Sequence, residues 1–114
     1  MRLFFVAFGW ALVALIVWLS LTPSPPSLDL GIPQADKLGH FSFYGLAMFW
    51  FARLYLRTPV RAAYAAGFIA MGIALEFIQA HVGRDFEVAD MAADAVGVAL
   101  GWAAALFLKL RLPA

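Results

Sequence analysis

The chain has 114 residues, of which 65% are hydrophobic and 13% are charged, and its formal net charge is +1. An ordinary soluble domain is about half apolar and about a quarter charged, so this composition excludes that class, and the low net charge excludes a basic nucleic-acid-binding surface. The absence of cysteine excludes disulfides, thiolate catalysis and cysteine-ligated metals. We expect one domain, residues 1–114, with the lipid bilayer as its solvent.

Four windows are long and apolar enough for membrane-spanning helices, each of which needs about 20 mostly apolar residues. They cover approximately residues 3–21, 38–56, 60–80 and 88–108. The prolines that follow Thr22 end the first window, because proline lacks a backbone donor. Pro59 is expected to open the third helix and Gly83 to close it. The predicted fold is all-α: an integral membrane bundle of four transmembrane helices, multi-pass in the inner (plasma) membrane.

The N-terminus also resembles a signal peptide, because Arg2 precedes an apolar run. That run is long for the apolar region of a signal peptide, and no A-x-A cleavage site precedes the prolines. We therefore expect residues 3–21 to remain as an uncleaved anchor helix.

Charge predicts the orientation of the bundle. Most basic residues fall at one set of predicted helix ends: Arg2, Arg53, Arg57, Arg61, Lys109 and Arg111. Every acid falls toward the other set, together with both histidines: Asp29, Asp36, Glu76, Asp85, Glu87, Asp90 and Asp94, with His40 and His81. Lysine and arginine mark the cytoplasmic side of membrane proteins. We predict an N-in/C-in topology, with the proline-rich loop and residues 81–87 outside.

Three of the windows bring polar side chains to the same predicted depth near the outer end. Asp36, His40 and Tyr44 are spaced by four, so they share one helix face. Polar residues also begin the fourth window and end the third. The candidate binding residues are Asp36, Lys37, His40, Tyr44, Glu76, Gln79, Arg84, Asp90 and Asp94.

The bilayer gives these groups a reason to gather. An ionised side chain near the bilayer centre costs ~2.5–3.5 kcal/mol on insertion scales, so such groups are expected to turn inward and pair. Glu76, Asp90 and Asp94 cannot all be ionised cheaply if they lie together, so we expect one to hold or share a proton. Intramembrane ion pairs can simply lock helices together. The variety of groups favours a polar site open to the outside.

Small residues recur along one face of the fourth window: Ala89, Ala93, Gly97, Gly101 and Ala105. Such a stripe lets two helix backbones approach closely. We favour a contact inside the monomer over association of two copies through the Gly97/Gly101 face, which stays open as an alternative.

Five segments resemble, in order and spacing, the VanZ-like family of small helical membrane proteins. They are SLTP at 20–23, DKLGHFSFYGL at 36–46, ALEFIQ at 74–79, GRDFEVAD at 83–90 and DAVGVALG at 94–101. The resemblance implies a helical membrane fold, and the member after which the family is named is linked to teicoplanin resistance. It marks as motif residues Asp36, Lys37, His40, Tyr44, Glu76, Gln79, Arg84 and Asp90. The chain departs at Asp94, where the family usually has Asn.

Two functional hypotheses use the polar site directly. In the first, it binds a lipid-linked or cell-wall-related envelope component, with Lys37, His40 and Arg84 meeting phosphate, and the protein contributes to glycopeptide tolerance. In the second, it is a membrane enzyme acting on a lipid-linked substrate, with Glu76 or Asp90 as general base and His40 as acid or partner. A histidine with carboxylates also suits a divalent cation, although the sequence assigns no metal ligand set and identifies no cofactor.

Two further hypotheses remain. Clustered carboxyl groups suit a proton- or ion-coupled carrier, but residues 62–75 of the third window carry no charge, so the inner half offers no polar path. The polar groups can also be purely structural. The expected partners are the lipid bilayer and an envelope component, and no nucleic acid.

Overall fold

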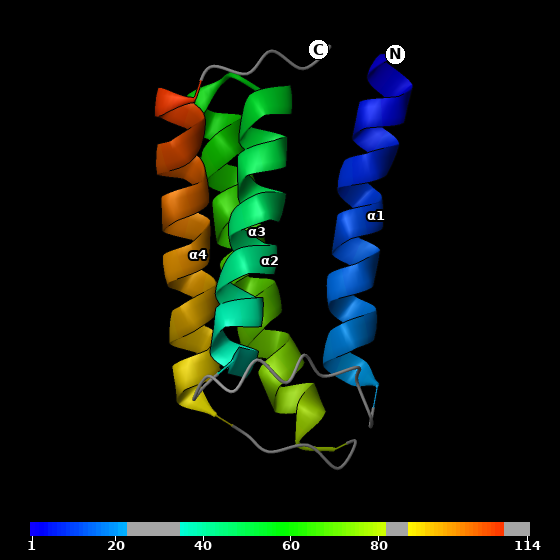
Figure 1. Cartoon of the computed structure of the whole chain (residues 1–114), viewed down its shortest axis with the longest axis vertical. Helices are drawn as coiled ribbons and strands as arrows, with labels where there is room; N and C mark the ends of the chain where they lie inside the picture. Colours follow the sequence, from blue (N-terminus) through cyan, green and yellow to red (C-terminus); the bar gives the residue numbers. More distant parts are fainter. Residues whose placement is uncertain (23–34, 82–86, 109–114) are drawn as a thin grey trace.

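The computed structural model describes residues 1–22, 35–81 and 87–108 (Figure 1). Within these residues the chain forms four α-helices, as predicted. They are α1 (Arg2–Leu21), α2 (Ala35–Leu54), α3 (Thr58–Gln79) and α4 (Val88–Phe107). Each agrees with its predicted window to within one turn, and Pro59 lies in the first turn of α3. The proline-rich loop, the Gly83 cap, Lys109 and Arg111 lie outside the described residues.

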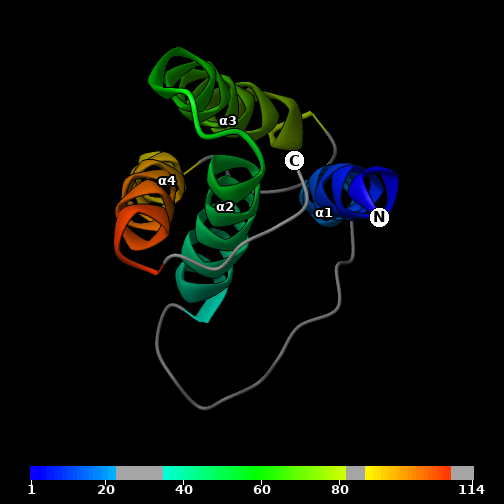
Figure 2. The ribbon, with the colours of Figure 1, turned by 90° about the horizontal axis from the view of Figure 1, so that it is seen from above.

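The helices run alternately up and down along one axis (Figure 1). Consequently α2 and α4 end, and α1 and α3 begin, at the upper end of the molecule in that view. Seen along the axis, α2 stands between the other three helices (Figure 2). Its contact with α4 is the most extensive in the chain, and it also packs against α1 and α3. The second helix of the sequence is therefore the central helix of the fold.

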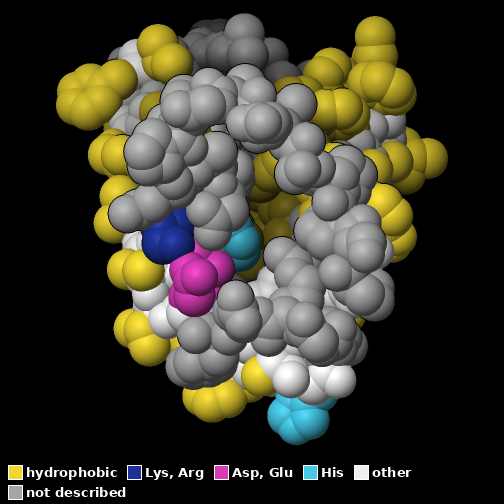
Figure 3. All heavy atoms as spheres, turned by 60° about the horizontal axis from the view of Figure 1, so that its bottom comes forward, with side chains coloured by type: hydrophobic (Ala, Val, Ile, Leu, Met, Phe, Trp, Pro, Cys, Tyr) yellow, Lys and Arg dark blue, Asp and Glu magenta, His cyan; other side chains and the backbone are white. Residues whose placement is uncertain are grey.

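Within the described residues, three helices are long and apolar enough to cross a membrane: α1, α3 and α4. A helix of 20 residues is about 30 Å long, which matches a hydrocarbon core of about 30 Å. Hydrophobic side chains cover the flanks of the bundle (Figure 3). The apolarity expected of all four windows does not extend to α2, because Lys37 and His40 near its start and Arg53 near its end lower its hydropathy.

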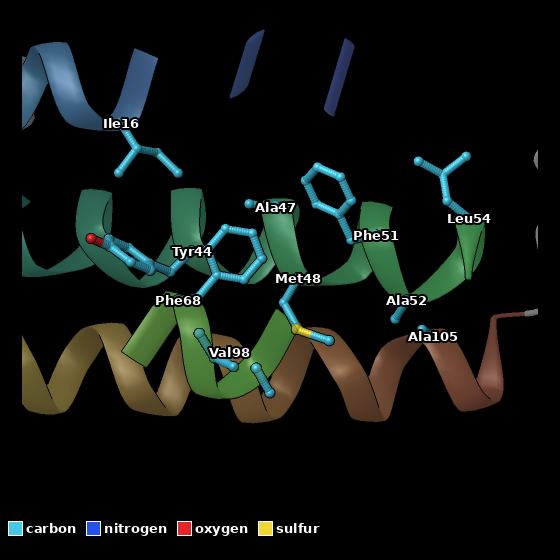
Figure 4. Close-up of a cluster of buried hydrophobic side chains, with 11 residues drawn as sticks. Ile16, Tyr44, Ala47, Met48, Phe51, Ala52, Leu54, Phe68, Val98 and Ala105 are labelled. Carbon is cyan, nitrogen blue, oxygen red and sulfur yellow. The ribbon is translucent and has the colours of Figure 1, made fainter. Parts of the chain in front are cut away.

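The centre of α2 carries the hydrophobic core. Phe51 and Met48 are fully buried on opposite sides of the helix, Phe51 toward α1 and Met48 toward α4 (Figure 4). The Phe51 ring stacks on Tyr64 of α3 with the centroids 4.5 Å apart, and its centroid lies 5.9 Å from that of Phe68. Because neighbours cover α2 on several sides, its polar residues face other helices, and a lower hydropathy is tolerated.

The close contact between α2 and α4 depends on two glycines of α4, Gly97 and Gly101, which have no side chain. A Cβ atom added to Gly97 would lie 2.4 Å from the carbonyl oxygen of Phe41, and one added to Gly101 would lie 2.3 Å from that of Gly45. Backbones this close allow dispersion contacts along both helices. Gly97, Gly101 and Ala105 of the small-residue face are thus buried inside the monomer, whereas Ala93 is half-buried and Ala89 is exposed.

Helix α1 lies at the side of the bundle, with few buried residues, and side-chain hydrogen bonds hold it near both ends. Trp50 Nε1 donates to the Phe5 carbonyl at 2.8 Å. Gln79 Nε2 donates to the Ser20 carbonyl at 2.9 Å. The Ser20 carbonyl is in the last turn of α1, where no intrahelical donor remains, so Gln79 satisfies a helix end as well as joining α3 to α1.

At the upper end, arginines satisfy helix C-termini. Arg61 Nε donates to the carbonyls of Ala52 at 2.8 Å and Tyr55 at 3.1 Å, and Arg53 Nη1 donates to that of Ala105 at 3.2 Å. Carbonyls at the end of a helix lack intrahelical donors, and a positive charge there is favourable. The residues that predict the orientation therefore also stabilise the ends of α2 and α4. We call this region, with Arg2, Arg53, Arg57 and Arg61, the basic end.

We predict that Gly101→Ala lowers the free energy of unfolding by about 1–3 kcal/mol, because the methyl group forces α2 and α4 apart. The matched control is Gly67→Ala on α3, where an added Cβ atom meets nothing within 4 Å, and it should leave stability unchanged or raise it by up to about 1 kcal/mol. Unfolding by SDS in mixed micelles measures both. Equal stability of the two variants would contradict close α2–α4 packing.

Candidate functional site: a buried polar cluster

A group of ionisable side chains gathers at the end of the bundle where α2 and α4 begin and α3 ends. Figure 3, in which this end is turned forward, shows basic, acidic and histidine side chains adjoining there. Three segments supply them: α2, the end of α3, and the start of α4 with the residue before it. We call them the polar cluster: Lys37, His40, Glu76, Glu87, Asp90 and Asp94.

Helix periodicity and the α2–α4 contact together explain why these side chains meet. Glu87, Asp90 and Asp94 are spaced by three and four, so they share one face of α4 and its N-terminal cap. Lys37 and His40 are likewise spaced by three at the start of α2. Because α2 and α4 are antiparallel neighbours with closely packed backbones, the two faces lie against each other within hydrogen-bonding reach.

His40 lies between two carboxylates of α4. Its Nδ1 is 2.9 Å from Asp94 Oδ1, and its Nε2 is 3.9 Å from Asp90 Oδ2. The Asp94 side chain is only 3% exposed, whereas the His40 side chain keeps 17%. When Asp94 is ionised, its Oδ1 accepts a hydrogen bond from His40 Nδ1–H, which fixes the orientation and tautomer of the imidazole and leaves Nε2 facing Asp90.

Lys37 joins the start of α2 to the start of α4. Its Nζ lies 2.5 Å from Glu87 Oε2 and 3.4 Å from Asp90 Oδ1. The Lys37 and Glu87 side chains are 21% and 39% exposed, so solvent screens the pair and its contribution to stability is modest. The ammonium group offsets part of the negative charge that α4 brings to the cluster.

Glu76 reaches from α3 to the beginning of α4. Its Oε1 accepts a hydrogen bond from the backbone N–H of Glu87 at 2.5 Å. Glu87 is the N-cap residue of α4, so the Glu76 carboxylate lies at a helix N-terminus, where a negative charge is favourable. Glu76 is 2% exposed, and this bond gives a buried acid a structural role.

The structure brings together five of the residues expected at the site: Lys37, His40, Glu76, Asp90 and Asp94. Tyr44 lies deeper, in the hydrophobic core, and its hydroxyl points toward the end of the bundle at which α2 begins (Figure 4). Gln79 is at the same end of the bundle but is bonded to the Ser20 carbonyl of α1.

Two predicted site residues cannot be placed in the cluster, and one member was missed. The Asp36 side chain and all of Arg84 lie outside the described residues. Glu87 was absent from the predicted site although it contacts Lys37. Its spacing of three from Asp90, one residue before a helix, was the available signal. The other histidine, His81, follows α3 and is exposed, and its Nδ1 lies 3.1 Å from the carbonyl oxygen of Phe77 in the last turn of that helix.

The balance of charge limits what the cluster can bind. It holds four carboxyl groups against one lysine and one histidine. Glu76, Asp90 and Asp94 are nearly fully buried, and carboxylates in such surroundings repel one another unless cations or protons intervene. Sharing of a proton among them stays a prediction. Among the residues that the structure describes, no group of three or more His, Asp and Glu side chains is arranged to hold a metal ion.

We predict that His40 and Asp94 are energetically coupled. A double-mutant cycle of His40→Ala and Asp94→Ala should give a coupling free energy of about 1–2 kcal/mol, because each single variant leaves a buried group without its partner. The matched control replaces the exposed histidine: His81→Ala with Asp94→Ala should couple by less than about 0.5 kcal/mol. A coupling free energy no larger than in the control would mean that the His40–Asp94 hydrogen bond contributes nothing to the free energy of unfolding.

The chemistry of the polar cluster follows from its own geometry. No protein-family model, curated protein or solved structure matches the chain. An imidazole between two carboxylates can hold or transfer a proton. Glu87, the partly exposed acid of the polar cluster, already pairs with Lys37 and can accept hydrogen bonds from a ligand's amines or hydroxyl groups.

Proposed function

We propose that the chain is a four-span membrane protein whose polar cluster faces the extracytoplasmic side and binds an envelope component, lipid-linked or cell-wall-related. One observation carries the proposal: three helices and the N-cap residue of α4 bring six ionisable side chains to one end of a largely apolar bundle. Ionisable groups at membrane depth are costly, and they commonly mark a functional site. The membrane we propose is the inner (plasma) membrane.

The packing of α2 supports its assignment as the fourth span. It is as long as α1 and lies alongside α4 through most of its length (Figure 1). Its polar first turns contact α4, where Lys37 and His40 find carboxylate partners. A helix of this kind can cross a bilayer with a low hydropathy, because its neighbours, and not lipid, surround its polar face.

The separation of charge supports the orientation. The basic end contains Arg2, Arg53, Arg57 and Arg61, whereas the polar cluster contains a single lysine. A cytoplasmic basic end follows from the bias of lysine and arginine toward that side. With an even number of spans, both termini of the bundle are then cytoplasmic and the polar cluster is extracytoplasmic.

Charge also indicates which part of an envelope component binds. Lys37 donates a hydrogen bond to Glu87 and forms an ion pair with Asp90, so the phosphate contact expected of it competes with two carboxylates. The excess of carboxyl groups favours a head group that supplies amines or hydroxyl groups, as the sugars and peptides of cell-wall precursors do. Contact of phosphate with Arg84 remains part of the proposal, and Arg84 lies outside the described residues.

Membership of the VanZ-like family is likewise proposed, and the positions of its motif residues support it. Lys37, His40, Glu76 and Asp90 come from three different motif segments and meet in one cluster. The glycines of the last segment form the α2–α4 contact. With this membership we propose a contribution to teicoplanin tolerance, the property linked to the family's founding member.

A second candidate function is catalysis, favoured by the geometry of His40. Its imidazole is oriented by Asp94, and a fixed orientation is one requirement of a general acid or base; its Nε2 lies 3.9 Å from Asp90 Oδ2. In this alternative His40, Glu76 and Asp90 act on a lipid-linked substrate. A carrier is less well supported, because residues 62–75 of α3 bring no charge to the other half of the bundle. A purely structural role remains the competing explanation of Glu76.

We predict opposite labelling of two single-cysteine variants, Arg57→Cys and His81→Cys. Both positions are exposed, and the chain has no cysteine of its own. A membrane-impermeant thiol reagent added to intact cells should label residue 81 at once and residue 57 only after permeabilisation. The reverse pattern would overturn the orientation, and labelling of both positions from outside would overturn the number of spans between them.

We predict that Glu76→Gln separates binding from folding. The amide oxygen still accepts from the Glu87 N–H, so the free energy of unfolding should fall by less than about 1.5 kcal/mol. Loss of the charge should weaken binding of a lipid-linked cell-wall precursor about tenfold or more. Native mass spectrometry in detergent measures binding, and acetylation of the precursor's amines is the ligand control.

The same variant has a cellular readout. Overproduction of the unaltered protein in a susceptible bacterium should raise tolerance to teicoplanin, and overproduction of Glu76→Gln should not. Turnover of the precursor, lost in His40→Ala, would favour the enzyme. Collective unfolding of the cluster variants, together with no binding by the unaltered protein, would favour the structural role and overturn the proposal.

A further inference from the structure

Gly72 of α3 leaves room for the Asp94 carboxyl group. A Cβ atom added to Gly72 would lie 2.7 Å from Asp94 Oδ2, 3.2 Å from its Cβ and 3.3 Å from its Cγ. The first of these distances is shorter than van der Waals contact permits, and the others are tight. Gly72 and Asp94 are both buried, with Asp94 only 2% exposed, so the carboxyl group has little free space to enter.

The two oxygens of Asp94 are thereby held from opposite sides. Oδ2 lies against the α3 backbone at Gly72, and Oδ1 lies 2.9 Å from His40 Nδ1 on α2. The carboxyl group of α4 is thus enclosed between its two neighbouring helices. Any side chain at residue 72 would turn this carboxyl group and so alter its bond to the imidazole.

The position of Gly72 on α3 ties it to the polar cluster. It precedes Glu76 by four residues, so the two share the face that α3 turns toward α4. Glycine is less favourable than alanine inside a helix, so the close approach of Asp94 is the physical reason for a glycine here. At Gly67, on the same helix, an added Cβ atom meets nothing.

We propose that Gly72 is the positioning residue of the polar cluster. Because glycine has no side chain, it leaves the space that the Asp94 carboxyl group occupies, and this carboxyl group in turn orients the His40 imidazole. The importance of Gly72 for ligand binding rests on the proposed function. Its effect on the positions of Asp94 and His40 does not depend on that function. If Gly72 served only to pack α3 against α4, replacing it would lower stability without specifically changing the environment of His40.

Histidine NMR separates these two roles. The chain has two histidines, so ¹⁵N-histidine labelling in micelles gives signals of His40 and of the exposed His81, which serves as an internal reference, and His40→Gln assigns them. In the unaltered protein His40 should show a single tautomer with Nδ1 hydrogen-bonded. Gly72→Ala should move the His40 signals toward those of His81, while Gly67→Ala leaves both unchanged.

Unchanged His40 signals in folded Gly72→Ala would overturn the proposal. If Gly72→Ala does not fold, the double variant Gly72→Ala with Asp94→Ala decides: recovery of folding supports a clash with the Asp94 side chain, and failure to recover overturns it. These measurements use no ligand. If the His40 signals do not move in Gly72→Ala, Gly72 is rejected as a positioning residue. If the unaltered protein does not bind the precursor, only the proposed function is rejected.

Discussion

The close approach of α2 and α4 is the contact on which the polar cluster depends. Gly97 and Gly101 leave the carbonyls of α2 almost in contact with α4, and this places His40 within 2.9 Å of Asp94. A wider separation would leave buried acids without partners, at a cost of several kcal/mol for each charge. The packing of α2 against α4 and the pairing of their polar side chains therefore depend on the same close approach of the two helices.

Within the cluster, one side chain can serve the fold and a ligand together. Glu76 caps α4 through the Glu87 N–H, yet it is also a buried acid beside other acids. Lys37 links two helices and offsets their negative charge. Because the same side chains can stabilise the fold and contact a ligand, the number and variety of polar groups alone do not distinguish a binding site from ion pairs that only hold helices together. The distinction lies in whether a change of charge at constant shape affects binding more than stability.

Much of the fold could be predicted from the sequence, because apolar length and proline position fix where helices begin and end. Spacing by three and four also identified His40, Glu76, Asp90 and Asp94, since residues on one face of a helix meet the same neighbour. Periodicity cannot reveal which helix lies opposite or at what rotation. For that reason the central place of α2, the contact of Glu87 with Lys37 and the bond from Gln79 to Ser20 required coordinates.

The hydrogen bonds of Arg53 and Arg61 to helix carbonyls have a consequence for how this chain could evolve. In other membrane proteins, moving lysine and arginine residues from one set of loops to the other can invert the topology while the helices themselves stay the same. In the proposed topology, the same two guanidinium groups mark the cytoplasmic side of the bundle and also complete the last turns of α2 and α4. An inverted descendant would have to acquire new terminal caps along with new loop charges, which makes its orientation hard to reverse by single substitutions.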